Sequence, residues 1–193
     1  FGGIPGSGLN FGSAINPKSI IDQPYQFDFY DGGGLDVAFL SFAEIDKNGN
    51  VNVSRFGNRN DGAGGFINIA QGAKKVVFSG TLTGGGLSTS IVKGNLKINK
   101  EGKNKKFVNK VNQITFSSKD GIKRGQSILF NTDRGLFKII NGKITLIEVA
   151  RGVRIKEDIL DQIPFKVNIS KNLKKIWKNI YYEKKIGLKK KIN

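Results

Sequence analysis

Glycine residues are the main candidates for chemistry in this sequence, because it contains neither His nor Cys. Without these residues, the chain can form neither catalytic triads that need histidine nor zinc sites with imidazole or thiolate ligands. Any reaction must therefore use carboxylates, Lys, Tyr, hydroxyl groups or backbone N–H groups. Glycine lets the backbone approach a ligand closely, with its N–H groups directed outward. Four groups of glycines lie at 2–12, 32–34, 62–65 and 84–86.

The third group is the most informative, because the sequence after it predicts a short helix. A glycine turn before a helix can form an anion or oxyanion site from backbone N–H groups. One such donor lowers the barrier of acyl transfer by about 3–4 kcal/mol. The group does not match the dinucleotide fingerprint, because Ile67 stands where the final glycine is needed. No P-loop is present either, since no Gly-Lys-Ser/Thr occurs.

Apolar alternation and turn residues predict a chain rich in β-strands. An Asn-Gly pair favours a hairpin turn, because type I′ turns need positive φ. The stretch "DKNGN" also resembles the start of a calcium loop, but the later acidic ligands are missing. We expect a loop or helical turn that ends near Pro24, then a strand region over 25–57 with a hairpin at Asn48-Gly49. A strand over 75–82 and a hairpin with a further strand over 94–116 should follow. The last predicted elements are a meander over 125–150, which turns at 133–135 and 141–142, and a short helix over 156–163 that ends at Pro164.

The net charge of +17 belongs to the second half of the chain. Residues 1–90 hold 6 Lys and Arg against 7 Asp and Glu, whereas residues 91–193 hold 26 against 8. A polyanionic partner is one interpretation. The other is a compositional bias toward Lys, Asn and Ile, with lysines on the solvated faces of strands.

The C-terminal segment has the spacing of an amphipathic helix, with Ser170 as its N-cap. Lysines fill the opposite face. Such a helix packs on the protein's own sheet or binds a membrane or polyanion. We expect residues 1–168 to form one domain and 169–193 a basic helix and tail. The apolar stripe comprises Leu173, Ile176, Trp177, Ile180 and Tyr181.

Two long blocks identify a family. The stretch "GGGLDVAFLSFAEIDKNGNVNVSRFG", followed by "GAGGFINIAQGAKKVVFSGTLTGGGL", resembles family I CoA-transferases of the acetate/propionate and 3-oxoacid type. The resemblance covers residues 1–170 and continues through "KRGQSILFNTDRGLFKI" and "GVRIKEDILDQIPFK". It implies an α/β fold with an open mixed β-sheet and flanking helices, as in the C-terminal domain of the CoA-transferase superfamily.

The resemblance also assigns roles to residues. The loop Gly62, Ala63, Gly64, Gly65 and Phe66 matches the family's Gly-x-Gly-Gly-Phe motif, which lines the CoA thioester site. The N–H of Gly65 matches a donor of the oxyanion hole.

A second motif, Glu-x-Gly-x-x-Gly-Gly, carries the nucleophilic glutamate of the family. Its closing pair matches Gly2 and Gly3, in a loop near the substrate, so we expect the glutamate four residues before Phe1. No acid of the chain matches the nucleophile, and we interpret Asp36 and Glu44 as structural charges. We therefore expect the chain alone to be inactive.

The resemblance implies a ping-pong reaction. The glutamate attacks an acyl-CoA and passes through an anhydride to a glutamyl-CoA thioester, from which a second carboxylic acid takes the CoA. Coenzyme A is thus a substrate, and no covalent cofactor or metal is expected. The expected partners are an acyl-CoA, a short-chain carboxylate such as acetate or propionate, the N-terminal CoA-transferase domain and further copies of the chain. Ketone-body or short-chain fatty acid metabolism is the expected context.

Three further expectations concern the setting of the protein. We expect neither nucleic acid nor membrane as partner, and a cytoplasmic location. The alternative is a non-catalytic assembly or anion-binding module that uses the basic second half. The sequence departs from the family pattern beside the glycine loop, at Asn58, Asn60 and Asp61, and again at Arg151.

Overall fold

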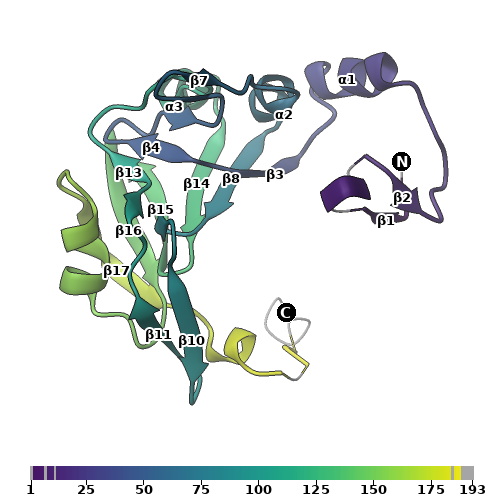
Figure 1. Ribbon diagram of the computed structural model, residues 1–193. Coiled ribbons are helices and arrows are strands. Elements are labelled where there is room, and N and C mark those ends of the chain that lie inside the picture. Colours follow the sequence, from purple (N-terminus) through teal and green to yellow (C-terminus); the bar gives the residue numbers. More distant parts are fainter. Residues whose placement is uncertain (1, 7, 11, 184, 188–193) are drawn as a thin grey trace.

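A six-stranded mixed sheet forms the centre of the molecule in the computed structural model, which describes residues 2–6, 8–10, 12–183 and 185–187 (Figure 1). The strand order is β17-β16-β15-β14-β8-β3. Strands β3, β8 and β14 are parallel, β15 is antiparallel to both neighbours, and β17 is parallel to β16. The predicted open mixed sheet is confirmed. The strands are β3 (Val37–Ser41), β8 (Lys75–Gly80), β14 (Ser127–Thr132), β15 (Gly135–Ile140), β16 (Lys143–Val149) and β17 (Asn168–Lys175).

Phenylalanines on one face of the sheet build the core. Phe78 of β8 and Phe130 of β14 are completely buried, and their rings stack with centroids 5.9 Å apart. Phe66 and Phe116 lie against Phe78 at 5.8 and 5.1 Å. A buried Phe side chain stabilises a fold by about 1.5–3 kcal/mol. This ring cluster therefore fixes the elements that carry Phe66 and Phe116 to the sheet.

Short helices and small ladders complete the fold. The helices are α1 (Gln23–Asp31), α2 (Phe66–Gly72) and α3 (Ser118–Lys123), with 3-10 turns η1 (Gly8–Asn10), η3 (Leu160–Gln162) and η4 (Lys178–Tyr181) and a π-helical turn η2 (Ile155–Ile159). The ladders are β1 (Ile4–Pro5) with β2 (Ala14–Ile15), β4 (Glu44–Asp46) with β5 (Val51–Asn52) and β13 (Phe107–Val108), β6 (Arg55–Phe56) with β7 (Arg59–Asn60), β9 (Thr83–Gly84) with β12 (Asn104–Lys105), and β10 (Ser88–Val92) with β11 (Asn95–Lys100).

Residues 25–31 differ from the prediction, since they form helix α1 and not the start of a strand. Pro24 lies in the first turn of this helix, where its missing N–H costs nothing and its fixed φ suits the helix. Pro24 therefore begins a helix and does not end one. The alternating aromatic residues predicted a strand, but in the helix the rings of Phe27 and Tyr30 contact each other at i, i+3 spacing, with their centroids 5.3 Å apart.

The predicted C-terminal amphipathic helix is wrong. Residues 168–175 form strand β17, which pairs with β16 through Leu146 opposite Ile169, and η4 follows over 178–181. Hydrogen bonding to the open edge of β16 outweighs the helical spacing of Leu173 and its neighbours. Lys184 of the expected helix and the lysines at 189–191 of the expected tail lie outside the described residues.

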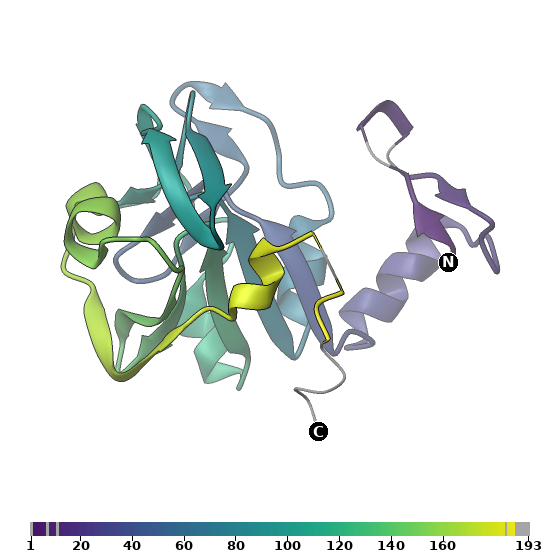
Figure 2. The same ribbon diagram turned by 90° about the horizontal axis from the view of Figure 1, so that it is seen from below.

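The N-terminal segment lies to one side of the sheet, with β1 and β2 beyond α1 (Figures 1 and 2). Helix α1 contacts α2, where Asn68 Nδ2 donates to both carboxylate oxygens of Asp31 at 3.0 Å. No residue of α1 is buried. Within the described part of the chain, no helix has the length and apolarity to span a bilayer.

Candidate functional site

The glycine loop at 62–66 joins β7 to helix α2, as the sequence predicted for a turn before a short helix. Gly62 and Gly64 have φ of 80° and 53°, which other residues rarely adopt. Gly65 has an ordinary φ of −78° and serves as the N-cap of α2. Its requirement is space, since an added Cβ would lie 2.5 Å from Cζ of Phe27 in α1. Phe66 then turns into the core at 9% exposure.

The backbone N–H groups of the loop fall into two sets. Those of Asp61 and Gly62 donate to the Ser54 carbonyl at 2.9 and 3.1 Å, and that of Phe66 donates to Ala63 O at 3.1 Å. Within residues 12–183, the N–H groups of Ala63, Gly64 and Gly65 have no hydrogen-bond acceptor. The loop thus leaves three donors unpaired, and an oxyanion could accept their hydrogen bonds.

Gly2 and Gly3 lie elsewhere, before the β1–β2 hairpin. Both have positive φ, 72° and 77°. The nearest atoms to an added Cβ belong to Lys18 for Gly2 and to Ile15 and Asn16 for Gly3. The structure therefore does not bring this pair together with the glycine loop.

The two acids set aside by the sequence make structural contacts. Asp36 forms an exposed ion pair with Lys74 at 2.8 Å, and the hydrogen bond from Lys74 lowers the pKa of the Asp36 carboxyl. Glu44 Oε2 accepts hydrogen bonds from Asn52 Nδ2 at 2.7 Å and from Asn112 N at 2.9 Å. These contacts fit the structural roles that the sequence predicts for both acids.

Sequence reasoning missed a buried ion pair at the carboxyl end of β14. The Arg134 side chain is completely buried and donates to both oxygens of Glu101, at 2.6 and 2.8 Å. These hydrogen bonds lower the pKa of the Glu101 carboxyl from 4.5 to about 2. Arg134 and Glu101 are hydrogen-bonded to each other, so neither charge is free for a ligand.

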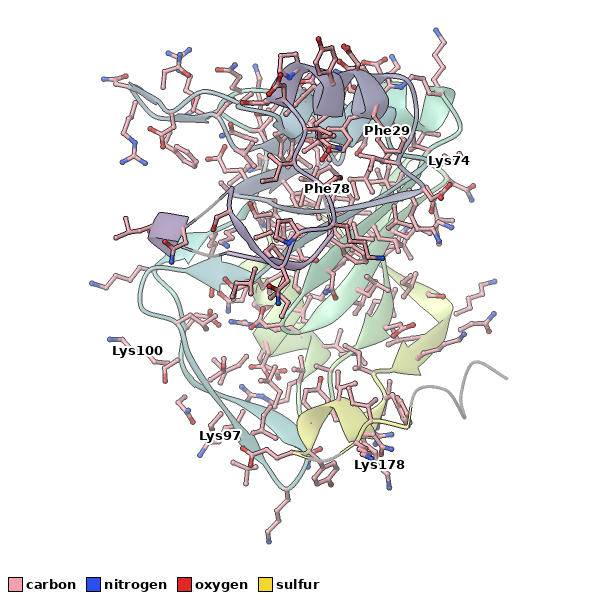
Figure 3. The ribbon with its side chains drawn as sticks, turned by 90° about the vertical axis from the view of Figure 1, so that its right-hand side faces the viewer. Phe29, Lys74, Phe78, Lys97, Lys100 and Lys178 are labelled. Atoms are coloured by element: carbon pink, nitrogen blue, oxygen red, sulfur yellow. The ribbon has the colours of Figure 1, made fainter. Side chains whose placement is uncertain are left out.

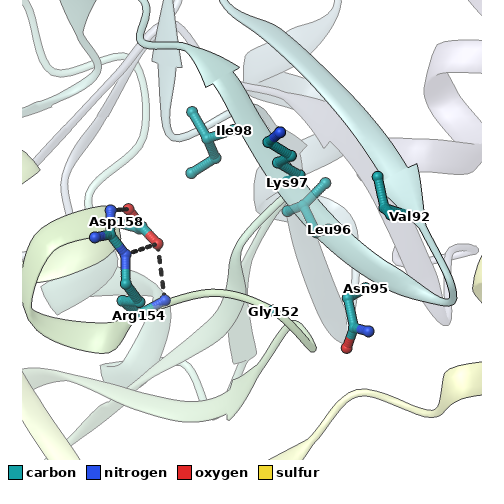
Figure 4. Close-up of a pocket in the computed structure, with 8 residues that line it drawn as sticks. All are labelled: Val92, Asn95, Leu96, Lys97, Ile98, Gly152, Arg154 and Asp158. Atoms are coloured by element: carbon teal, nitrogen blue, oxygen red, sulfur yellow. Dashed lines mark hydrogen bonds and ion pairs between the residues drawn. The ribbon is translucent and has the colours of Figure 1, made fainter.

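A separate hollow of about 430 Å³ lies between the β10–β11 hairpin and the turn at Gly152 (Figure 4). Three charged groups line it, and two of them, Arg154 and Asp158, already form an ion pair at 2.8 Å, while Lys97 is the third. The described residues contain no group of three or more Asp and Glu that could hold a metal ion. The glycine loop therefore remains the strongest candidate site.

Comparison with known proteins identifies the class to which this fold and loop correspond. No family model matches the sequence. The chain is 48% identical to a caffeate CoA-transferase of Acetobacterium woodii over 97% of its own length and 37% of that protein. It is 44% identical to the acetate CoA-transferase YdiF of Escherichia coli over 96% of its length and 35% of that protein. The chain thus spans about a third of these relatives.

Solved structures agree. The apoenzyme of the acyl-CoA transferase YdiF from Escherichia coli O157:H7 matches with a TM-score of 0.88 over 91% of this chain and 34% of that one. The chain is therefore a homologue of the family I CoA-transferases, and the resemblance found in the sequence is confirmed. The AibA/AibB decarboxylase matches at 16% identity with a TM-score of 0.60, which indicates a shared fold alone.

Proposed function

We propose that this chain forms the thioester-binding part of a CoA-transferase that moves coenzyme A between a short-chain acyl-CoA and a carboxylic acid. The observation that carries the proposal is the set of unpaired N–H groups at Ala63, Gly64 and Gly65, in a loop whose surrounding sequence is 44–48% identical to named CoA-transferases. A related YdiF structure is described as a thioester complex with CoA. In the proposal, Gly65 N–H is one oxyanion donor, and the loop from Gly62 to Phe66 receives the thioester.

The proposed reaction forms one thioester for each thioester that it consumes. A glutamate, expected outside the printed residues, attacks the acyl-CoA carbonyl, and the CoA thiolate leaves. The thiolate then attacks the glutamyl carbonyl of the anhydride, which releases the first carboxylate and forms the glutamyl-CoA thioester. A second carboxylate reverses the two steps. Each tetrahedral intermediate carries an oxyanion, and Gly65 N–H stabilises it without rearrangement of the loop.

Several finer assignments belong to the same proposal. Acetate is the favoured acid because the E. coli relative is named for it; propionate, 3-oxoacids and caffeate are the other candidates. Gly2 and Gly3 join the substrate loop only when the N-terminal segment closes on the glycine loop. We further propose a cytoplasmic, homo-oligomeric enzyme that needs an N-terminal CoA-transferase domain, with a domain boundary near residue 168. The relatives compared here give no support to the alternative of an anion-binding module.

A chimera tests the proposal. Residues 1–193 replace the matching segment of E. coli YdiF, and transfer of CoA from acetyl-CoA to propionate is followed by chromatography of the thioesters. We expect turnover by the chimera and none by the isolated chain. A folded chimera without turnover would contradict the proposed function.

The role of Gly65 needs a matched pair of variants. Both carry Phe27→Ala, because an added Cβ at position 65 would otherwise meet that ring at 2.5 Å. Gly65→Ala keeps the N–H and Gly65→Pro removes it. The loss of one oxyanion donor lowers kcat by about 100- to 1000-fold. Equal kcat values for the two variants would exclude Gly65 as a donor.

A further inference from the structure

The glycine loop rests on a buried polar cluster to which the proposed mechanism gives no role. Asn52, Ser54 and Thr115 are 0%, 2% and 7% exposed. A polar group left without a partner at such depth costs about 1–3 kcal/mol. Burial of these side chains therefore depends on their hydrogen bonds, several of which fix the backbone that precedes the loop.

Asn52 fixes the backbone that precedes the loop. Its side-chain carbonyl accepts hydrogen bonds from Ser54 N at 3.0 Å and Arg55 N at 3.2 Å. Its amide group donates to Glu44 Oε2 at 2.7 Å and to Arg55 O at 2.6 Å. An amide is the side chain that both accepts and donates in this way. Asp in this position would face the Glu44 carboxylate.

Thr115 reaches the same backbone from a distant part of the chain. Its Oγ1 lies 2.8 Å from Ser54 Oγ and accepts a hydrogen bond from Val53 N at 3.2 Å. The Thr115 N–H in turn donates to Val51 O at 2.9 Å. Asn52 and Thr115 therefore hold Ser54 from two sides.

Ser54 makes the connection to the loop itself. Its carbonyl oxygen accepts the N–H groups of both Asp61 and Gly62, so both of its lone pairs are used. Gly62 is the first residue of the loop, and Gly65 follows three residues later. The Ser54 carbonyl therefore fixes the start of the loop that carries the Gly65 N–H.

We infer that Asn52, Ser54 and Thr115 are positioning residues that hold the Gly65 N–H in place for acyl transfer. The inference rests on the proposed function, and it adds three residues that do not touch the substrate. A donor displaced by about 1 Å costs up to about 100-fold in rate. Substrate binding depends less on this geometry, so the effect falls on kcat and spares KM.

Thr115→Val is the decisive variant, because valine has the same shape and lacks the hydroxyl group. In the YdiF chimera we expect kcat to fall by about 10- to 100-fold with little change in KM for acetyl-CoA. Thr115→Ser keeps the hydroxyl group and restores kcat. Thr145→Val is the matched control, because Thr145 is 5% exposed and donates to Lys143 O in β16, away from the loop. Ser54→Ala provides a second variant that keeps the carbonyl.

Hydrogen exchange on the 193-residue chain gives a readout that does not depend on activity. We expect the amides of Asp61 and Gly62, which donate to the Ser54 carbonyl, to exchange faster in Thr115→Val than in the wild type, and at the wild-type rate in Thr145→Val. Unchanged exchange there overturns the inference, and so does unchanged kcat in Thr115→Val and Ser54→Ala. An inactive wild-type chimera would contradict the proposed function instead, and the exchange rates would still decide whether Thr115 holds the loop.

Discussion

Arg134 shows how a single residue can join several elements. Its guanidinium contacts Glu101 twice, the carbonyl of Asp158 at 2.6 Å and Asp133 at 3.4 Å. Loop 101–103, strand β14 and the turn η2 meet at this one side chain. Because the guanidinium is completely buried, these acceptors must offset the free-energy cost of removing its charge from water.

The first prediction concerns the loss of one acceptor. Glu101→Gln leaves the buried guanidinium without its closest carboxylate, so we expect the free energy of unfolding to fall by about 1–3 kcal/mol, less than for a fully buried pair because the Glu101 side chain is 34% exposed. Urea denaturation at neutral pH measures it. Asp161→Asn is the control, because its ion pair with Lys156 is exposed and contributes about 1 kcal/mol or less. Equal effects of the two substitutions would contradict the prediction.

The same pair predicts a dependence on pH. The pKa of Glu101 is about 2 in the folded protein and 4.5 without the pair, so folding favours the ionised carboxylate. The resulting stability is complete above a pH of about 4.5 and is lost as the pH falls toward 2. The difference in unfolding free energy between the wild type and Glu101→Gln should therefore shrink over this interval. A difference that stays constant on acidification would show that the charge does not matter.

Local turn chemistry made some elements predictable. Asn141 and Gly142 both have positive φ, 50° and 72°, and they join β15 to β16 where the sequence predicted a turn. The predicted hairpin at Asn48-Gly49 is present too, as β4 and β5, although only Gly49 has positive φ. The placement of the glycine loop before α2 follows from the same local rules.

Elements set by distant contacts were not predictable. Strand β17 exists because β16 offers an open edge, which no local pattern records. Ser54 and Thr115 meet although they are 61 residues apart, so single-sequence reasoning had no signal for the polar cluster.

Lys93 and Gly94 form the turn of the β10–β11 hairpin with φ of 51° and 75°, where a Lys-Gly pair gives a weaker signal than Asn-Gly.

Helix α1 gives a prediction at the level of elements. An added Cβ at Gly72 in α2 would lie 2.1 Å from the Tyr30 carbonyl oxygen, so Gly72→Ala must displace one helix from the other. Because α1 has no buried residue, we expect it to detach while the sheet stays folded. Limited proteolysis should cut the segment 17–36 faster. Gly84→Ala is the control, since its nearest neighbour lies at 3.5 Å. An unchanged cleavage rate would mean that the helices adapt without separating.

At the scale of the whole molecule, exposed lysines lie at both ends. Lys97, Lys100 and Lys178 lie toward the surface at the lower end of the molecule, while Lys74 lies at the opposite end (Figure 3). All four are exposed. Lys97 and Lys100 of β11 fit the interpretation of lysines on solvated strand faces, whereas Lys178 lies in η4 and Lys74 precedes β8.

The N-terminal segment predicts self-association. Leu9 and Ile20 are 107% and 89% exposed, and exposed apolar area of this kind drives association. We expect the 193-residue chain to sediment as a dimer or larger species. The double variant Leu9→Ser and Ile20→Ser should shift the distribution toward monomer. Ile91→Ser is the control, since Ile91 is 46% exposed on the β10–β11 hairpin. A monomeric wild type would contradict the prediction.

The two edges of the central sheet differ in a way that limits its growth. Edge strand β17 carries Lys171, Lys174 and Lys175, whereas edge strand β3, with the sequence VAFLS, has no charge. Lysines on an edge oppose the addition of a strand from another molecule. A strand from a neighbour should therefore add more readily at β3 than at β17. Two copies that pair through their β3 strands would leave two charged edges outside, which oppose further growth of the sheet into a fibre.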